Sequence, residues 1–204
     1  MEPKKVFKSK KRKTMLKKLL ITSLLFSITS LAISQNKLKT IETTYSGSDA
    51  WKNWTIQTDN SSGRISTVYS GNDAWKSWNV NLAKINGRIS TIYSGDDAWK
   101  KWNFDIASYN GTIQTVFNGD DAWKDWELNS DKYKLRISTV YSGDDAWKEW
   151  EITANGSTMK VYTTYSGNDS WKEWSIDDRL DKIPVEIKIV AAFICVFSGY
   201  YHSK

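Results

Sequence analysis

The stretch Tyr141–Trp150, which reads YSGDDAWKEW, occurs in six closely similar copies along the chain. Each copy begins 24 residues after the one before it. The first residues of the copies are Tyr45, Tyr69, Tyr93, Phe117, Tyr141 and Tyr165. An unbroken period of this length is typical of repeat proteins, in which one unit cannot bury its own apolar face and its neighbours supply the core. The sequence therefore predicts one repeat domain, which we place at residues 41–180.

Two alternating stretches flank the motif in every copy. Before it, Ile65, Thr67 and Tyr69 alternate with variable residues, with the period of two expected of a β-strand. After it, the second tryptophan shares a face with the apolar residue two positions later, as Trp78 does with Val80. Each copy therefore predicts two strands, and the fixed Ile, Thr and Tyr side chains are expected on a buried face.

An all-β fold follows, and two strand arrangements fit the pattern. In a β-solenoid each unit is one coil, and like strands stack in parallel. In an antiparallel meander of β-hairpins, Asn86–Gly87 is a turn signal that places Val80 opposite Tyr93. Against the meander, the fifth copy carries its Asn-Gly three residues earlier, at Asn155–Gly156, and a single sheet leaves a wide apolar face uncovered. We therefore favour the β-solenoid and keep the meander as the alternative.

The composition changes after the last copy. Pro184–Lys188 leads into nine consecutive apolar residues, Ile189–Phe197, which Ser198–Gly199 ends. Proline and glutamate in a first turn and glycine after the last turn are helix start and stop signals. Because the open end of a solenoid needs a cover, residues 181–204 are predicted to form a C-terminal capping helix.

The N-terminus is typical of an export signal. Of the net charge of +6, residues 1–18 carry +8, and the uncharged apolar run Leu19–Ile33 follows. This run is shorter than a bilayer span, and small residues precede Gln35 as at a cleavage site. We interpret residues 1–34 as a signal peptide and residues 35–40 as a linker. The alternative is an uncleaved membrane anchor formed by residues 19–33.

Charge and rare residues limit the function classes. The remainder of the chain carries −2, whereas a nucleic-acid binder needs positive charge on its folded surface. Cys195 is the only cysteine and His202 the only histidine, so no disulfide framework, Cys/His metal cluster or Ser/His/Asp set can be assembled. Catalysis also needs dissimilar groups, whereas a repeat supplies equal copies of one environment. We expect a protein that is not an enzyme, with no cofactor.

The expected function is that of an exported binding or structural module at the bacterial cell envelope or outside the cell, in the periplasm or secreted. One alternative is a glycan-binding module that uses turn tryptophans, because a flat indole face stacks on a sugar ring. Another is a membrane-anchored scaffold. The expected partner is an unidentified protein or glycan, and not a nucleic acid.

The candidate site residues come from the motif itself. The second tryptophan of each pair keeps phase with its strand and is expected in the core. The first lies in the turn, where it can be a core residue or present an exposed face to a ligand. The candidate binding residues are the first tryptophan and its lysine in every copy: Trp51, Trp75, Trp99, Trp123, Trp147, Trp171, Lys52, Lys76, Lys100, Lys124, Lys148 and Lys172. If these tryptophans are protected, the variable outer positions Ser66, Val68, Asn79 and Asn81 become the better candidates.

One aspartate in each copy precedes the Ala-Trp-Lys segment. These residues are Asp49, Asp73, Asp97, Asp121, Asp145 and Asp169. The simplest expectation is that each carboxylate caps the short segment through backbone N–H groups, while the lysine balances its charge. A row of cation sites is the weaker alternative.

Overall fold

Each 24-residue unit folds as a strand, a loop with one turn of 3-10 helix, and a second strand. The computed structural model describes residues 36–203, so the signal peptide or anchor predicted for residues 1–34 lies outside the described residues. The strands are β1 (Leu38–Thr43), β2 (Asn53–Thr58), β3 (Ser62–Thr67), β4 (Ser77–Leu82), β5 (Ile85–Thr91), β6 (Lys101–Ile106), β7 (Tyr109–Thr115), β8 (Asp125–Ser130), β9 (Lys134–Thr139), β10 (Glu149–Ala154), β11 (Ser157–Thr163) and β12 (Glu173–Asp178). The 3-10 turns are η1 (Ala50–Lys52), η2 (Ala74–Lys76), η3 (Asp96–Lys100), η4 (Ala122–Lys124), η5 (Ala146–Lys148) and η6 (Ser170–Lys172). One α-helix follows, α2 (Val185–His202).

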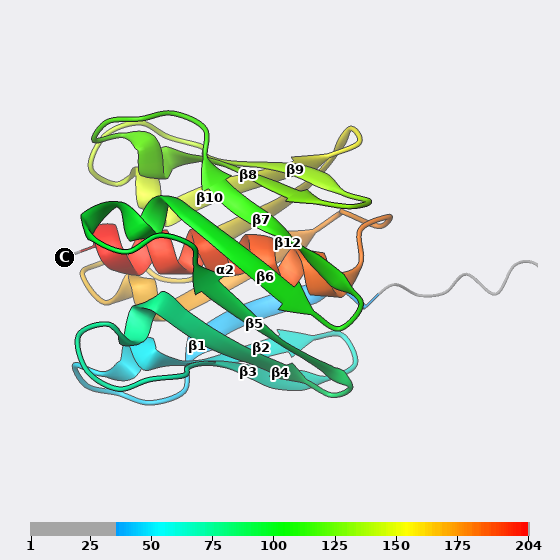
Figure 1. Cartoon of the computed structure of the whole chain (residues 1–204), viewed down its shortest axis with the longest axis horizontal. Helices are drawn as coiled ribbons and strands as arrows, with labels where there is room; N and C mark the ends of the chain where they lie inside the picture. The colour runs from blue at the N-terminus through cyan, green and yellow to red at the C-terminus, as the bar shows by residue number, and fades with distance from the viewer. Residues whose placement is uncertain (1–35, 204) are drawn as a thin grey trace, which may run out of the picture. The chain divides into compact units, whose positions relative to one another are not determined.

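The twelve strands form one antiparallel meander that closes into a barrel (Figure 1). Every strand pairs with its neighbours in the sequence, and β1 pairs with β12 to complete the circle. The prediction of an all-β repeat fold is confirmed. The preference for a solenoid was wrong, because consecutive strands are antiparallel neighbours in one sheet, and the alternative meander of hairpins fits.

The hairpin turns lie three residues before the position that Asn-Gly suggested in the second and third units. Leu82 pairs with Ile85, so the turn is at Ala83–Lys84, and Gly87 lies within β5 opposite Val80. Ala83 adopts the left-handed backbone conformation with φ 51°, as Asn155 does at the same position of the fifth unit. Asn155–Gly156 therefore lies at the same turn position as Ala83–Lys84. The offset of this Asn-Gly from Asn86–Gly87 was therefore no argument against the meander.

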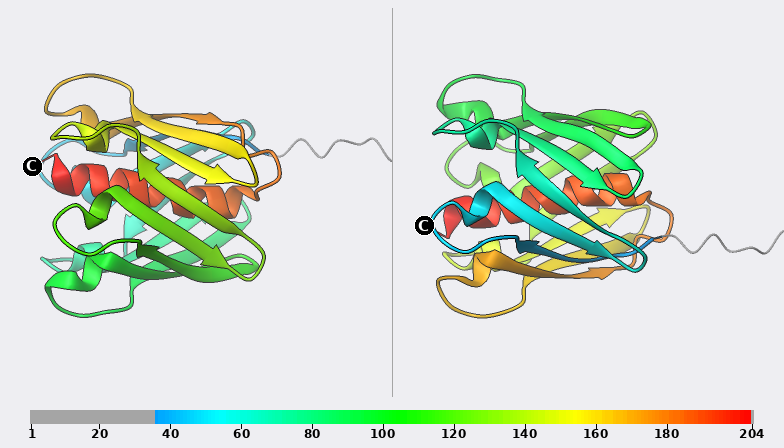
Figure 2. Two further views of the ribbon diagram at one scale, coloured as in Figure 1. Left: turned by 90° about the horizontal axis from the view of Figure 1, so that it is seen from above. Right: turned by 90° about the horizontal axis from the view of Figure 1, so that it is seen from below.

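The buried face of the sheet points into the barrel, where α2 fills the interior (Figure 2). The inward side chains include the six second tryptophans, Trp54, Trp78, Trp102, Trp126, Trp150 and Trp174, each at most 2% exposed. Their assignment to the core is confirmed. The C-terminal helix also exists, but its predicted position as a cap was wrong. The sheet covers its apolar face by wrapping around α2, which is why a single layer of strands is sufficient.

The helix has the composition of a core element. Among the described residues, α2 is long and apolar enough to cross a membrane by length and composition alone, yet 72% of its residues are buried inside the barrel. Gly199 lies so close to the Trp174 ring that an added Cβ would overlap it. Close packing against the tryptophans therefore fixes the position of the helix.

Twelve tryptophans form a closed ring of contacts inside one end of the barrel. The first tryptophan of each unit meets the second tryptophan of the next unit edge to face, with ring centroids 5.9–6.3 Å apart. Trp171 of the last unit makes this contact with Trp54 of the first. Edge-to-face pairs of aromatic rings add stability beyond the area that they bury. The same contact therefore joins all six units and closes the barrel.

A buried ion pair anchors the start of the helix. Lys188 Nζ lies 2.9 Å from Asp178 Oδ2, and the side chains are 0% and 1% exposed. The Asp178 carboxylate also accepts hydrogen bonds from the backbone N–H groups of Leu38 and Leu180, both at 3.0 Å. One carboxylate thus holds the first strand, the last strand and α2 together.

Candidate functional site

The two ends of the barrel differ. One end, here called the loop end, carries the six loops with the 3-10 turns and the C-terminus of α2, and the other end carries the short hairpin turns (Figure 1). All the candidate site residues of the motif lie at the loop end, since the motif forms these loops. The barrel thereby gathers six copies of one sequence around a single rim.

The turn tryptophans line the interior of this rim. Trp51, Trp75 and Trp99 are half-buried, and the other three are buried, with exposed fractions of 5–7%. Trp51 stacks on Tyr200 with ring centroids 5.4 Å apart, and Trp123 stacks on His202 at 4.0 Å. The structure does not show a line of fully exposed indole faces, one of the two possibilities that the sequence leaves open, because aromatic residues of the last turns of α2 pack against these rings.

The lysines and aspartates of the motif pair with each other. In every unit the lysine Nζ lies 2.6–2.9 Å from the carboxylate three residues earlier and 5.4–5.6 Å from the centroid of the adjacent tryptophan ring. The expected charge balance is confirmed. The expected cap was wrong, because none of the six 3-10 turns has a side-chain cap hydrogen bond, and a backbone bond such as Ala50 N–H to Gly47 O at 3.1 Å closes the turn instead.

The aspartates do not gather around a common point. Within residues 36–203 the structure brings no three His, Cys, Asp or Glu side chains into a group that can hold a metal ion. The aspartate side chains are 72–79% exposed, and each has its own lysine. Their arrangement is that of six separate surface ion pairs, which contribute little to stability one by one.

Six exposed aromatic side chains surround the loop end, and sequence reasoning placed them wrongly on the buried face. They are Tyr45, Tyr69, Tyr93, Phe117, Tyr141 and Tyr165, and we call them the outer aromatic ring. Their exposed fractions are 53–63%. Each strand ends at the threonine two residues earlier and the chain then bends, so alternation no longer decides where the aromatic side chain points. The Ser-Gly that follows is a turn signal and could have shown that the strand stops there.

Two members of the outer aromatic ring, Tyr45 and Phe117, lie beside cationic side chains of the outer barrel wall. The Arg64 guanidinium is 5.9 Å from the centroid of the Tyr45 ring, and that of Arg136 is 5.7 Å from the Phe117 ring. In both pairs the cation lies 19 residues after the aromatic residue. These two aromatic rings are therefore held against the outside of the next hairpin, where a ligand on the barrel wall can reach them.

One hollow beside this ring lies between the third and fourth units. Its volume is about 480 Å³, and Tyr93, Lys101 and Gln114 are among its lining residues. Asp97, Lys100 and Asn118 also line it. This size is within the range of small-ligand sites, and the lining combines an aromatic face with charged and amide groups.

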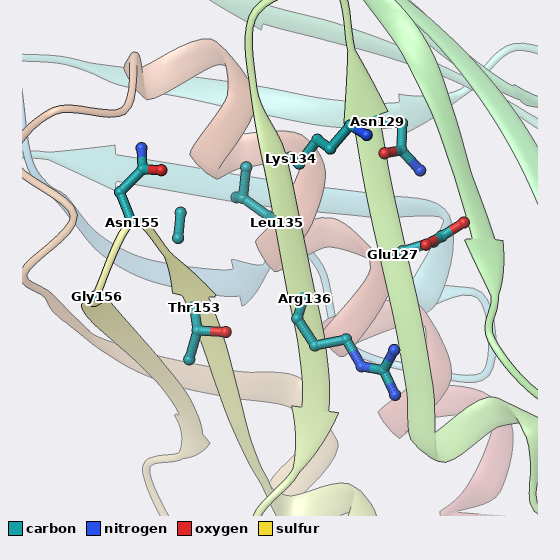
Figure 3. Close-up of a pocket in the computed structure, with 9 residues that line it drawn as sticks. Glu127, Asn129, Lys134, Leu135, Arg136, Thr153, Asn155 and Gly156 are labelled. Carbon is teal, nitrogen blue, oxygen red and sulfur yellow. The ribbon is translucent and has the colours of Figure 1, made fainter.

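A second hollow, of about 370 Å³, lies beside β9, where the residues and the strand pairing differ from those of the other units (Figure 3). Leu135 occupies the position where β3 has Gly63. The β9–β10 pairing ends at Arg136 and Thr153, one pair earlier than the Gly63–Leu82 pairing of β3 with β4. Two of its charged groups are already engaged, since Arg136 pairs with Asp125 and Glu127 accepts a hydrogen bond from Gln114, and no aromatic side chain is among its lining residues. This hollow is therefore the weaker candidate.

The two residues with the strongest pKa shifts belong to α2. Burial lowers the pKa of His202 to about 4, the nearby Lys124 acts in the same direction, and Asp121 opposes it. Burial raises the pKa of the Cys195 thiol well above its usual value. His202 is thus held neutral at pH 7, and Cys195 is held as a thiol in the core.

Comparison with known proteins identifies no similar family, protein or structure. No protein-family model matches this sequence. No curated protein matches it, and no solved structure matches the fold. The functional interpretation therefore depends on the geometry of the loop end.

Proposed function

We propose that this protein is an exported, non-enzymatic binding module that contacts a polymeric ligand of the cell envelope or the extracellular space through its outer aromatic ring. The observation that carries the proposal is the exposure of all six aromatic side chains, at 53–63%. A side chain this exposed contributes little to the core, so packing does not explain why every unit has an aromatic residue at this position.

The arrangement of the ring favours a ligand with repeated chemistry. Closure of the barrel sets six equivalent aromatic positions around one rim, each followed four residues later by the aspartate of an Asp-Lys ion pair. Several weak contacts of this kind combine when one ligand reaches more than one of them, because the second contact becomes intramolecular. Glycans and extended protein surfaces satisfy this condition, whereas a single small molecule does not.

The test is retention of the purified full chain on insoluble bacterial envelope material. Replacing the six ring residues by serine is expected to reduce the retained fraction at least about tenfold, because the aromatic contacts are lost together. Tyr162→Ser is the matched control, since Tyr162 is an exposed tyrosine, at 39%, on β11 and outside the ring. Equal retention of the six-serine variant and the wild type, with both folded by circular dichroism, would contradict the proposal.

Export has a separate test, which depends on residues 1–34. N-terminal sequencing of the protein secreted by a bacterial host is expected to begin at Gln35, as the sequence predicts for a cleaved signal peptide. Recovery of the intact N-terminus in washed membranes would instead support the alternative of a membrane-anchored scaffold.

A further inference from the structure

The groove between the third and fourth units differs from the other five inter-unit positions in charge. Lys101 opens β6 and pairs across the sheet with the neutral Gln114 of β7. The equivalent positions in the other units hold Asn53, Ser77, Asp125, Glu149 and Glu173. This groove is therefore the only one of the six with a lysine at that position.

The positive charge of Lys101 is not neutralised by a neighbour. Lys100, the adjacent lysine, lies 2.6 Å from Asp97, which balances its charge. No ion pair involves Lys101 within residues 36–203. By contrast, the corresponding carboxylates Asp125 and Glu149 bind Arg136 and Lys160. The groove thus presents one uncompensated ammonium group.

An exposed aromatic face lies in the same groove. Tyr93 is 53% exposed and lines the hollow together with Lys101, Gln114 and Asn118. A flat aromatic face suits the apolar face of a pyranose ring, and amide groups at its edge suit hydroxyl groups. An ammonium group next to that face selects for a carboxylate on the ring.

We propose that this groove binds a pyranose ring that carries a carboxylate, as a unit of an acidic polysaccharide. The ring stacks on Tyr93, its carboxylate pairs with Lys101, and Gln114 and Asn118 bind its hydroxyl groups. The inference rests on the proposed function, because it names the ligand class of one position of the outer aromatic ring.

The charge of the rim favours a polysaccharide over an anionic membrane. The loops of the fourth, fifth and sixth units, residues 117–125, 141–149 and 165–173, each contain more acidic than basic residues. A flat anionic bilayer would approach all six loops at once and be repelled by these three. A flexible polymer can instead place one acidic sugar in the groove where the uncompensated Lys101 lies beside the exposed ring of Tyr93.

The test is calorimetric titration of the purified full chain with a hexamer of galacturonate and, separately, with a neutral hexamer of glucose. We expect the acidic hexamer to bind and its affinity to fall at least about tenfold at roughly 0.5 M salt, because an ion pair contributes. Tyr93→Ala and Lys101→Gln are each expected to weaken binding at least about tenfold, since each removes one of the two principal contacts. Tyr162→Ala is the matched control, since Tyr162 is an exposed tyrosine on β11 outside the outer aromatic ring, and it is expected to leave the affinity nearly unchanged.

Three results would overturn the inference: no binding of the acidic hexamer, equal binding of the neutral hexamer, or unchanged affinity in Lys101→Gln. Circular dichroism and thermal unfolding of each variant show whether it is folded, and substitutions at these surface positions are expected to be tolerated. If the acidic hexamer fails to bind while the six-serine variant still loses retention on envelope material, the inference is wrong and the proposed function stands.

Discussion

At the residue scale, the spacing of the two tryptophans has a direct physical explanation. In five units the indole N–H of the second tryptophan donates a hydrogen bond to the backbone oxygen of the first, at 2.5–2.7 Å. A buried indole N–H needs such a partner, and one turn of 3-10 helix brings the carbonyl group three residues earlier within reach. The motif Trp-Lys-x-Trp therefore provides both the core side chain and its hydrogen-bond acceptor.

The burial of the second tryptophan could be predicted from the sequence, but the environment of the first could not. Trp78 keeps the alternation of β4, and alternation indicates a face of a sheet. Trp75 lies in a turn, and its ring is covered by Phe197, which is 122 residues later in the chain. No local pattern contains that contact, so the sequence left open whether the turn tryptophans are buried or form an exposed binding face.

A pH titration tests the packing of the last turn of α2. Burial lowers the pKa of His202 to about 4, from 6.5 in the unfolded chain. As the pH falls, the imidazole of the unfolded chain is protonated near pH 6.5, whereas that of the folded protein stays neutral until about pH 4. Protonation therefore favours the unfolded state, and the free energy of unfolding decreases between these two pH values and is unaffected by this residue above pH 6.5. His202 is the only histidine, so its imidazole signals in an NMR titration need no assignment by mutagenesis. We expect a midpoint near 4, and a midpoint near 6.5 would show that the ring does not stack on Trp123.

At the element scale, the hairpins show where turn signals succeed and where they fail. Asn155–Gly156 is a turn, as the sequence suggests, whereas Asn86 and Gly87 lie within β5. The reason for Gly87 is steric, because an added Cβ would overlap the backbone of β6 at Asp105 and Ile106. Close approach of strands and left-handed turns both favour glycine, and the sequence alone does not distinguish them.

The position of α2 and the junction of β1 with β12 depend on the buried Asp178–Lys188 pair. Asp178→Asn leaves the Lys188 ammonium without its counterion in the barrel, and removing one partner of a buried pair typically costs about 3–5 kcal/mol. We expect the free energy of unfolding, measured by urea denaturation, to fall by about that amount.

The double variant Asp178→Asn, Lys188→Met is the control for this measurement. It removes the buried charge together with its partner, and it is expected to be more stable than Asp178→Asn alone. If the free energy of unfolding of Asp178→Asn lies within about 1 kcal/mol of the wild-type value, Lys188 reaches solvent or another partner, and the account of the pair is contradicted.

At the scale of the whole molecule, closure of the sheet into a barrel arranges the six units around the helix. The sequence shows six units and two strands in each, but strand alternation is the same in a solenoid and in a meander. What decides between them is the antiparallel pairing of consecutive strands, and the β1–β12 pairing and the contact between Trp171 and Trp54 then close the sheet around the helix. Closure also places the six residues of the outer aromatic ring around one rim, on which the proposed function depends.

Cross-linking of the first and last strands tests this closure most directly. Thr40 and Ser175 are opposite each other in β1 and β12. In a Cys195→Ser background, the pair Thr40→Cys and Ser175→Cys is expected to form an intramolecular disulfide under mild oxidation, seen as a mobility shift that reductant reverses. The matched control is Thr55→Cys with Arg64→Cys, the equivalent pair of β2 and β3. Equal cross-linking of both pairs is the predicted result, whereas a disulfide that forms in the control pair but not between positions 40 and 175 would contradict the closed barrel.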